Sequence, residues 1–434
     1  MNMTKELFLF ELTQQLINLP KDERDRTREY YSEMIADRIE EGMDEADAVA
    51  GLGDPASIAR DVIQSWRELN ESLPVPSETR SGAALKSVSI EDMSGDIAVE
   101  SGAVSSAYEL EYANCAAEDY SLSEQDGALV IRYIRKKPEG RFALFGMLSG
   151  NRRLTVRLAD GVESLSVRTS SGDMDLDHLN VKTLTLSSAS GDMTIENVRC
   201  AEAALNTASG DAKLREFGAE SLEIRTASGD IELESASVSG NAHLLTRSGD
   251  ARLDRVESGA LKFEGTSGDF ECDDLRVQSA MEIAAISGDV RLRGVQAENC
   301  DVHTVSGDLR TDNCDIANKF AASFTSGDCE LENVNAGSVQ VKAISGDLRL
   351  ENVQARGELS ACGTSGDVDV DSVSGSGILL STRNGDIRGT LRDVPGGYEF
   401  RAKTSMGDAN VPQTRGEHIV EASTSYGDIS LEIE

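Results

Sequence analysis

The stretch Ser221-Leu-Glu-Ile-Arg-Thr-Ala-Ser-Gly-Asp-Ile-Glu-Leu233 decides the fold. Leu222 and Ile224 alternate with polar residues before the Ser-Gly-Asp, and Ile231 and Leu233 do so after it. Period-two alternation on both sides of a glycine turn is typical of two short strands, each with one apolar face. The stretch therefore predicts a strand, a turn and a second strand whose apolar sides share one interior.

The Gly-Asp of this turn recurs along the chain, mostly every 19 or 20 residues, and Ser precedes it in every unit up to Gly366. The turn glycines are Gly172, Gly191, Gly210, Gly229, Gly249, Gly268, Gly288, Gly307, Gly327, Gly346, Gly366, Gly385, Gly407 and Gly427. Repeats of this length indicate solenoids or arrays, and a propeller blade needs roughly 40 residues. We expect a mostly β protein, a single-chain β-solenoid of about 14 coils with two short strands each, with its handedness left open.

Four segments are predicted from the order of these signals. Residues 1–70 read as a small N-terminal α-helical domain, with Pro20, Gly42 and Gly53 ending successive helices and Asp54 capping the last. Residues 71–81 read as a linker, and residues 82–170 as an irregular β N-terminal part of the solenoid. The regular Ser-Gly-Asp solenoid is expected over residues 171–434.

Stacking one coil on the next predicts a column of carboxylates roughly 5 Å apart. The structural interpretation is that each aspartate accepts backbone N–H bonds within its own turn, helped by the preceding serine. The turn residues so assigned are Gly172, Asp173, Gly191, Asp192, Gly210, Asp211, Gly229, Asp230, Gly249 and Asp250.

Calcium binding is the alternative interpretation of this column. Calcium takes six to eight oxygen ligands, and one carboxylate per coil supplies few. The stretches Asp173–Asp177 and Asp367–Asp371 lack the glycine that an EF-hand has at its sixth position, where His178 and Ser372 stand. We therefore expect no cofactor and no metal, with calcium kept as the alternative.

A basic and apolar segment interrupts the acidic chain before the regular repeats. It is interpreted either as a hairpin that covers the first coil or as a docking loop for an acidic partner or a membrane surface. The candidate docking residues are Arg135, Lys136, Lys137, Arg141, Phe142 and Phe145.

Composition excludes several classes of function. A net charge of −35 disfavours nucleic acid as a partner. Seven cysteines without a CxxC pair favour a reducing compartment, and no apolar run reaches the roughly 18 residues of a membrane helix. A cytoplasmic protein is expected, with the cell surface as the alternative. The four scattered histidines and the absence of HExxH, GxSxG and phosphate-loop motifs predict no enzyme.

Two family resemblances rest on these residues. The first segment resembles the HAAS helical signalling domain, above all through Leu52-Gly-Asp-Pro-Ala-Ser-Ile-Ala59, together with Leu19-Pro20 and Tyr30-Tyr31. Residues 82–434 resemble the "putative-adhesin" β-strand-repeat family through the recurring Ser-Gly-Asp. The resemblance implies a bacterial protein of unknown biochemical function, in signalling or envelope-stress contexts near PadR-type regulators or membrane proteins. It brings no catalytic residues.

Together these observations predict a non-enzymatic scaffold. The helical domain would dock a protein partner, and the solenoid would act as a rigid display rod in a monomer or small homo-oligomer. A calcium-stabilised adhesin-like surface module and a self-assembling filament are the alternatives, the second because open solenoid ends expose unpaired strand edges.

Overall fold

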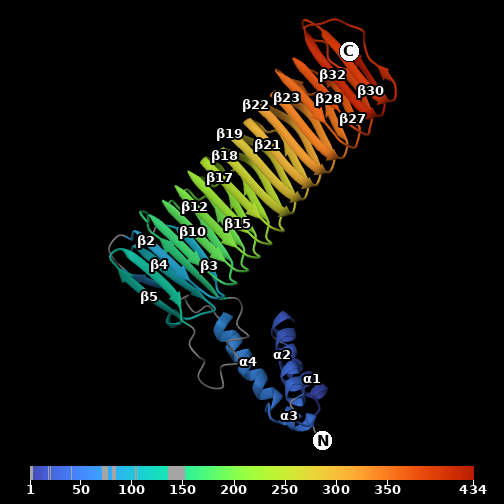
Figure 1. Ribbon diagram of the computed structural model, residues 1–434. Helices are drawn as coiled ribbons and strands as arrows, with labels where there is room; N and C mark the ends of the chain where they lie inside the picture. The colour runs from blue at the N-terminus through green and yellow to red at the C-terminus, as the bar shows by residue number, and fades with distance from the viewer. Residues whose placement is uncertain are drawn as a thin grey trace. The chain divides into compact units, whose positions relative to one another are not determined.

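The computed structural model describes residues 3–17, 19, 21–40, 42–70, 77–80, 85–102, 104, 106–134 and 152–434. Strands make up most of it and helices a small part, which confirms a mostly β solenoid preceded by short helices (Figure 1). The chain divides into two compact units. One unit contains Met1–Thr79, Glu109–Tyr120 and Ile134–Leu154, and the other contains Arg80–Tyr108, Ser121–Tyr133 and Thr155–Glu434.

The N-terminal helices are α1 (Lys5–Gln15), α2 (Lys21–Glu40), α3 (Glu45–Ala50) and α4 (Pro55–Asn70). Thr4 caps α1 by accepting the Leu7 N–H, and Asp54 accepts the Ser57 N–H at the start of α4. Gly42 and Gly53 adopt the positive φ that ends a helix, at +95° and +104°. The packed core of this domain is formed by Phe8, Leu9, Leu12, Leu16, Leu19, Tyr31, Ile35, Ala48, Val49, Ala59 and Val62.

The described residues form 33 strands, most of which wind as the solenoid. They are β1 (Ser77–Arg80), β2 (Ser87–Glu91), β3 (Asp96–Ser101), β4 (Tyr108–Ala113), β5 (Tyr120–Gln125), β6 (Ala128–Tyr133), β7 (Arg153–Leu158), β8 (Ser164–Arg168), β9 (Met174–Asp177), β10 (Thr183–Ser188), β11 (Met193–Glu196), β12 (Glu202–Thr207), β13 (Ala212–Arg215), β14 (Gly218–Ala219), β15 (Ser221–Thr226), β16 (Ile231–Glu234), β17 (Ser237–Thr246), β18 (Ala251–Ser267), β19 (Phe270–Ser287), β20 (Val290–Arg293), β21 (Gln296–Ser306), β22 (Leu309–Ser326), β23 (Cys329–Ser345), β24 (Leu348–Glu351), β25 (Gln354–Ala355), β26 (Glu358–Cys362), β27 (Val368–Val373), β28 (Gly377–Ser381), β29 (Ile387–Leu391), β30 (Tyr398–Met406), β31 (Ala409–Asn410), β32 (His418–Tyr426) and β33 (Ile429–Ile433). Residues 77–80, predicted as linker, therefore form a strand.

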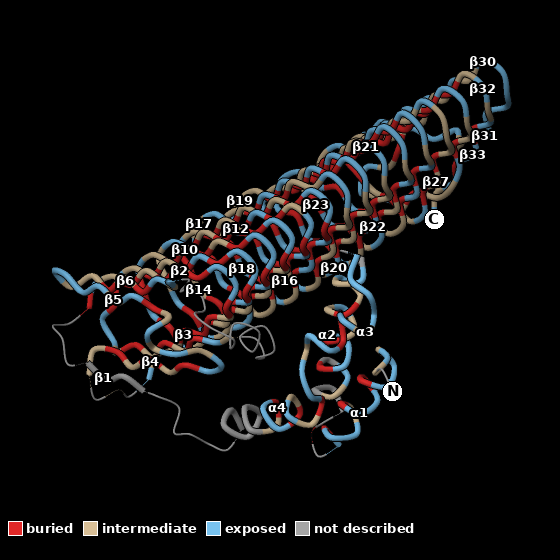
Figure 2. The backbone as a smooth tube through the Cα atoms, turned by 90° about the horizontal axis from the view of Figure 1, so that it is seen from below, coloured by how far each residue is buried: buried red, intermediate tan, exposed pale blue. Residues whose placement is uncertain are grey.

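The quoted stretch forms one coil in the expected way. Leu222, Ile224, Ile231 and Leu233 are all at most 2% exposed. Strand β15 pairs in parallel with β12 on one side and β17 on the other, and β16 pairs with β13 and β18. The apolar residues of each coil thus face a narrow interior, which runs as a buried line through the solenoid in Figure 2.

Stacked glycines form the first corner of every coil. A Cβ atom on Gly229 would lie 1.9 Å from the carbonyl oxygen of Gly210, so no side chain fits there. The same close approach repeats from Gly172, which lies on Gly95, to the last coil. The Ser-Gly-Asp around Gly95 therefore belongs to the regular stack, although the sequence placed it in an irregular segment.

A second corner lies six residues after each turn glycine from Gly172 to Gly366, and the residue types at this position did not reveal it. The residue there adopts a left-handed conformation with φ between +49° and +63°. Its members are His178, Asn197, Glu216, Ser235, Arg255, Asp274, Gly294, Asn313, Asn333, Asn352 and Ser372. Asparagine tolerates this conformation better than most residues, which explains its frequency in the column.

The two ends of the solenoid do not follow chain order, which corrects the expected stacking. Strand β32 lies between β28 and β30, so the last coil in the sequence is inserted beneath the one that precedes it. At the other end β2 lies between β6 and β8. These pairings at the two ends are all parallel, as in the regular coils.

Candidate functional site

The aspartates of the Ser-Gly-Asp turns form a hydrogen-bonded ladder. The Oδ1 atom of Asp230 accepts the backbone N–H of Asp250 at 2.8 Å, and Asp250 accepts that of Asp269 at 2.8 Å. Fourteen such bonds join fifteen aspartates from Asp96 to Asp408. The carboxylate therefore binds the next coil, whereas the sequence predicted a bond within its own turn.

Hydroxyl groups supply the bond within the turn in the first coils. The Gly229 N–H donates to Thr226 Oγ1 at 2.8 Å, and the Gly249 N–H donates to Thr246 Oγ1 at 2.9 Å. From Gly268 onward the turn glycines adopt positive φ instead, and the Gly268 N–H donates to the Ser287 carbonyl of the next coil. The turn thus changes type between Gly249 and Gly268.

Basic side chains offset the charge of the aspartate column. The Arg291 guanidinium bridges two rungs, with Nη1 3.1 Å from Asp269 Oδ2 and Nη2 2.9 Å from Asp289 Oδ2. The hydrogen bond to Asp269 raises the pKa of Arg291 above its usual value. Arg388 contacts Asp367 in the same way at 3.1 Å. Across the described ranges, no three His, Cys, Asp or Glu side chains are grouped to hold a metal.

The candidate docking loop lies outside the described residues. This applies to Arg135, Lys136, Lys137, Arg141, Phe142 and Phe145, all of which fall within residues 135–151. Its role stays a prediction.

A weakly charged surface, which we call the low-charge face, covers six consecutive coils. It consists of the outward residues two, four and six positions before Gly268, Gly288, Gly307, Gly327, Gly346 and Gly366. These residues are Lys262, Glu264, Thr266, Glu282, Ala284, Ile286, Asp301, His303, Val305, Ala321, Ser323, Thr325, Gln340, Lys342, Ile344, Ser360, Cys362 and Thr364. Two lysines stand against three carboxylates, a formal charge of −1 (2 − 3) in a chain of −35.

The strands that follow the same turns are fully charged by comparison. Their outward residues are Glu271, Asp273, Arg291, Arg293, Arg310, Asp312, Glu330, Glu332, Arg349, Glu351, Asp369 and Asp371. Arg293 pairs with Asp273 at 3.3 Å, and Arg349 pairs with Glu351 at 3.2 Å. The two sides of one turn therefore differ sharply in polarity, a contrast that becomes visible only when the coils are aligned.

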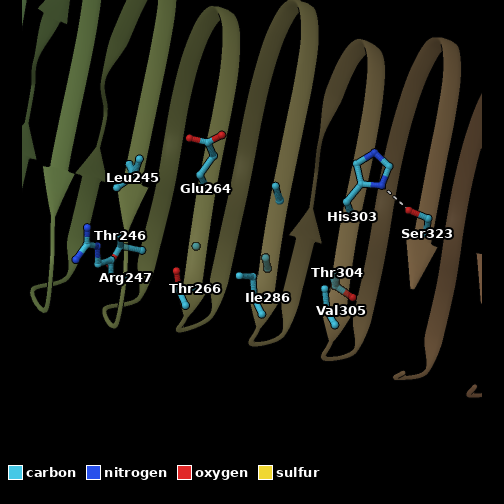
Figure 3. Close-up of a pocket in the computed structure, with 13 residues that line it drawn as sticks. Leu245, Thr246, Arg247, Glu264, Thr266, Ile286, His303, Thr304, Val305 and Ser323 are labelled. Carbon is cyan, nitrogen blue, oxygen red and sulfur yellow. Dashed lines mark hydrogen bonds between the residues drawn. The ribbon is translucent and has the colours of Figure 1, made fainter. Parts of the chain in front are cut away.

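A groove with a volume of about 610 Å³ runs over the first coils of the low-charge face. Figure 3 shows Thr266, Ile286 and Val305 on successive coils along it. Ile286 is 52% exposed and Val305 47% exposed, which is high for such side chains. Gly265 lies in its wall, where a Cβ atom would meet the buried Phe263 ring at 2.9 Å.

One constellation in the groove superficially resembles a hydrolytic triad. His303 Nδ1 hydrogen-bonds Ser323 Oγ (Figure 3), and His303 Nε2 lies 3.2 Å from Asp301 Oδ1. The sequence missed this cluster because the serine is on the neighbouring coil. Strands β21 and β22 pair in parallel along this stretch, so their N–H groups are committed to the sheet and none is positioned as an oxyanion donor. The cluster is an exposed polar contact.

The helical domain presents an apolar stripe of its own. Leu7 and Phe10 on α1 are 41% and 62% exposed, and Ile17 just beyond the helix is 61% exposed. The spacing of three residues places Leu7 and Phe10 on one helical face, and Ile17 follows the end of the helix as a further exposed apolar side chain. This stripe, which we call the α1 stripe, lies opposite Phe8, Leu12 and Leu16, which are completely buried in the core.

Most of the cysteines are buried thiols. Cys272, Cys300, Cys314 and Cys329 are at most 2% exposed, and none of the seven cysteines forms a disulfide. Burial raises the pKa of Cys314 to about 11 and that of Cys200 to about 12. A raised pKa keeps the thiol protonated, so these residues serve as apolar core.

A model of the Toastrack DUF4097 family matches residues 85–245, 238–332 and 316–434. The chain belongs to the Toastrack family. A HAAS family model matches residues 7–61 of this Toastrack protein. Both matches confirm the resemblances drawn from Leu52–Ala59 and from the recurring Ser-Gly-Asp.

Among solved structures, the Toastrack chain is similar to the crystal structure of "a putative adhesin" from Bacteroides fragilis NCTC 9343. The two are 12% identical, with a TM-score of 0.17, and the match covers 83% of this chain and 98% of that one. No curated protein matches. Within the described helices, none combines the length and apolar character that crossing a bilayer requires.

Proposed function

We propose that this Toastrack protein is a non-enzymatic interaction scaffold. The helical domain docks a signalling or membrane protein, and the solenoid serves as a rigid display rod. The α1 stripe carries this proposal, because Phe10 and Ile17 stay exposed although the domain already has a filled core. Exposed apolar residues at helical spacing fit the apolar face of a partner helix.

The construction of the solenoid supports the display role. Every coil is held to both neighbours by parallel strand pairs, by stacked glycines and by the aspartate ladder. In solenoids each repeat contacts only its neighbours, so closely bonded coils give a stiff body that keeps its surface in fixed register.

A cytoplasmic location forms part of the proposal, with cell-surface display as the alternative. The supporting observation is that none of the seven cysteines forms a disulfide, since disulfides would be expected in an oxidising compartment.

Affinity capture with the full chain tests the docking role. The wild type, the double variant Phe10→Asp/Ile17→Asp and the control Gln14→Asp are each used as bait in lysate of the source cells. A partner captured by the wild type is then purified, and its Kd is measured for all three baits. We expect Gln14→Asp, which changes an exposed polar residue of α1, to bind like the wild type.

The double variant should bind at least tenfold more weakly, because it introduces charge into an apolar contact. Circular dichroism establishes that its helices remain folded. Equal binding by the wild type and the double variant would show that the α1 stripe is not the docking surface.

A further inference from the structure

The low-charge face carries a row of β-branched residues that reads nearly the same in both directions. The row consists of the residues two positions before each turn glycine, Thr266, Ile286, Val305, Thr325, Ile344 and Thr364. Their neighbours pair in exact register, as Ser287 with Ser306 and Ser326 with Ser345. When the row is aligned with its own reverse, Thr266 matches Thr364 and Ile286 matches Ile344. Val305 matches Thr325, whose side chain has the same shape.

This symmetry is what a contact between two identical copies requires. In an isologous interface, residue i of one copy contacts residue j of the other, and j contacts i. A twofold axis parallel to the strands, placed between the coils of Gly307 and Gly327, would reverse the coil order and keep each column facing itself. Ile286 of one copy would then meet Ile344 of the other.

We propose that two copies of this chain associate face to face through the low-charge face, with their solenoids antiparallel.

The groove and the row complement each other in this arrangement. Ile344 is 56% exposed, and the twofold axis would place it over the groove beside Ile286 of the other copy. The protruding Ile344 and the groove beside Ile286 thus lie on the same face of one chain, three coils apart.

Charge supports the same pairing. The axis would place Asp301 opposite Ala321, Glu282 opposite Gln340 and Lys342 opposite Ala284, so no like charges are opposed within the six coils. Lys342 would also lie diagonally across from Glu282, within reach of long side chains. Two chains of −35 repel each other over most of their surface, and this face, at −1, is where they can approach.

The size of the face predicts a weak dimer. Six coils at ~4.8 Å and about six strand residues at ~3.3 Å give a combined contact of roughly 1,150 Å². Stable interfaces begin near 1,200 Å². Arg247 and Arg383 occupy the row in the next coil at either end, and they would oppose each other at the wet rim. The contact is therefore confined to six coils.

Sedimentation velocity of the full chain from 1 to 300 μM tests the proposal. We expect a reversible monomer–dimer equilibrium that Ile286→Asp/Ile344→Asp weakens at least tenfold. The control Ile419→Asp adds one such charge per chain instead of two, at an apolar residue that is 37% exposed and outside the face, and it should leave the equilibrium unchanged. A monomer at all concentrations, or a dimer insensitive to the face variant, would overturn the proposal.

Disulfide cross-linking tests the orientation. The background carries Cys115→Ser, Cys200→Ser and Cys362→Ser, which leaves only buried thiols. We expect a mixture of the Ile286→Cys and Ile344→Cys chains to cross-link on oxidation, and Ile286→Cys alone not to, because the two Ile286 positions lie about three coils apart. Cross-linking of Ile286→Cys alone would contradict the antiparallel arrangement.

Discussion

At the residue scale, the aspartate of Ser-Gly-Asp acts between coils. Its carboxylate accepts one N–H from the next coil, and its own N–H donates to the coil before it. The repulsion expected of stacked carboxylates is reduced because each Oδ1 faces a donor and because arginines such as Arg291 reach the remaining oxygens. The aspartate column therefore serves mainly to hold neighbouring coils together.

Replacing one rung tests this role. Asp250→Ala removes the acceptor for the Asp269 N–H and should lower the free energy of unfolding by about 1 kcal/mol. Asp250→Asn retains an acceptor oxygen and should lose less than half as much. Urea unfolding followed by circular dichroism measures both. Equal losses for the two variants would assign the effect to charge and not to the hydrogen bond.

The reactivity of the cysteine thiols follows from their burial. Burial raises the pKa of Cys314 to about 11, and it also raises that of Cys300 and Cys329. The thiolate is the reactive form, so at pH 9 these groups stay protonated below their pKa and react slowly. Timed alkylation followed by mass spectrometry should label them only after unfolding. Rapid labelling of the folded protein at Cys314 would contradict the buried placement.

At the scale of the element, each coil depends on one corner without a side chain. Gly229→Ala would place a Cβ atom 1.9 Å from the Gly210 carbonyl oxygen, so the backbone must shift. We expect a loss of about 2–4 kcal/mol in stability. Ser228→Ala, at an exposed neighbour in the same turn, should change stability by less than about 0.5 kcal/mol. Comparable effects of the two variants would mean that the glycines are not closely stacked.

Sequence predicted the coil well because its signals are local. Alternation around Gly229 identified Leu222, Ile224, Ile231 and Leu233 as interior, and all four are buried. The second corner was missed because residues as different as Glu216 and Arg255 adopt the same left-handed conformation there. Its constraint comes from the closure of the coil and not from residue preference.

The order of the last coils could not be predicted for a related reason. Gly407 and Gly427 each follow the repeat, and either could stack on Gly385 with the same parallel register.

The low-charge face was missed because its residues are about 20 positions apart and only alignment of the coils brings them together. The helical stripe was not predicted because the apolar run Leu7–Phe10 does not by itself show which of its side chains stay exposed.

At the scale of the whole molecule, the solenoid is a stack whose carboxylates are already bonded. If calcium is not required, adding 2 mM calcium or a chelator should leave the thermal midpoint unchanged within about 1 °C. The physical reason is linkage, since a ligand that binds the folded state must raise the midpoint. A rise of several degrees with calcium would restore the calcium-stabilised alternative.

Amide hydrogen exchange shows most directly whether the solenoid is one continuously bonded, rigid platform. The N–H groups of Asp230, Asp250, Asp269 and Asp289 lie at surface turns, where unbonded amides exchange within seconds. Because each donates to the aspartate of the neighbouring coil, we expect them to be protected like the N–H groups of the buried strands. Turn amides that exchange as fast as an unfolded peptide would contradict the ladder and the rigid platform that depends on it.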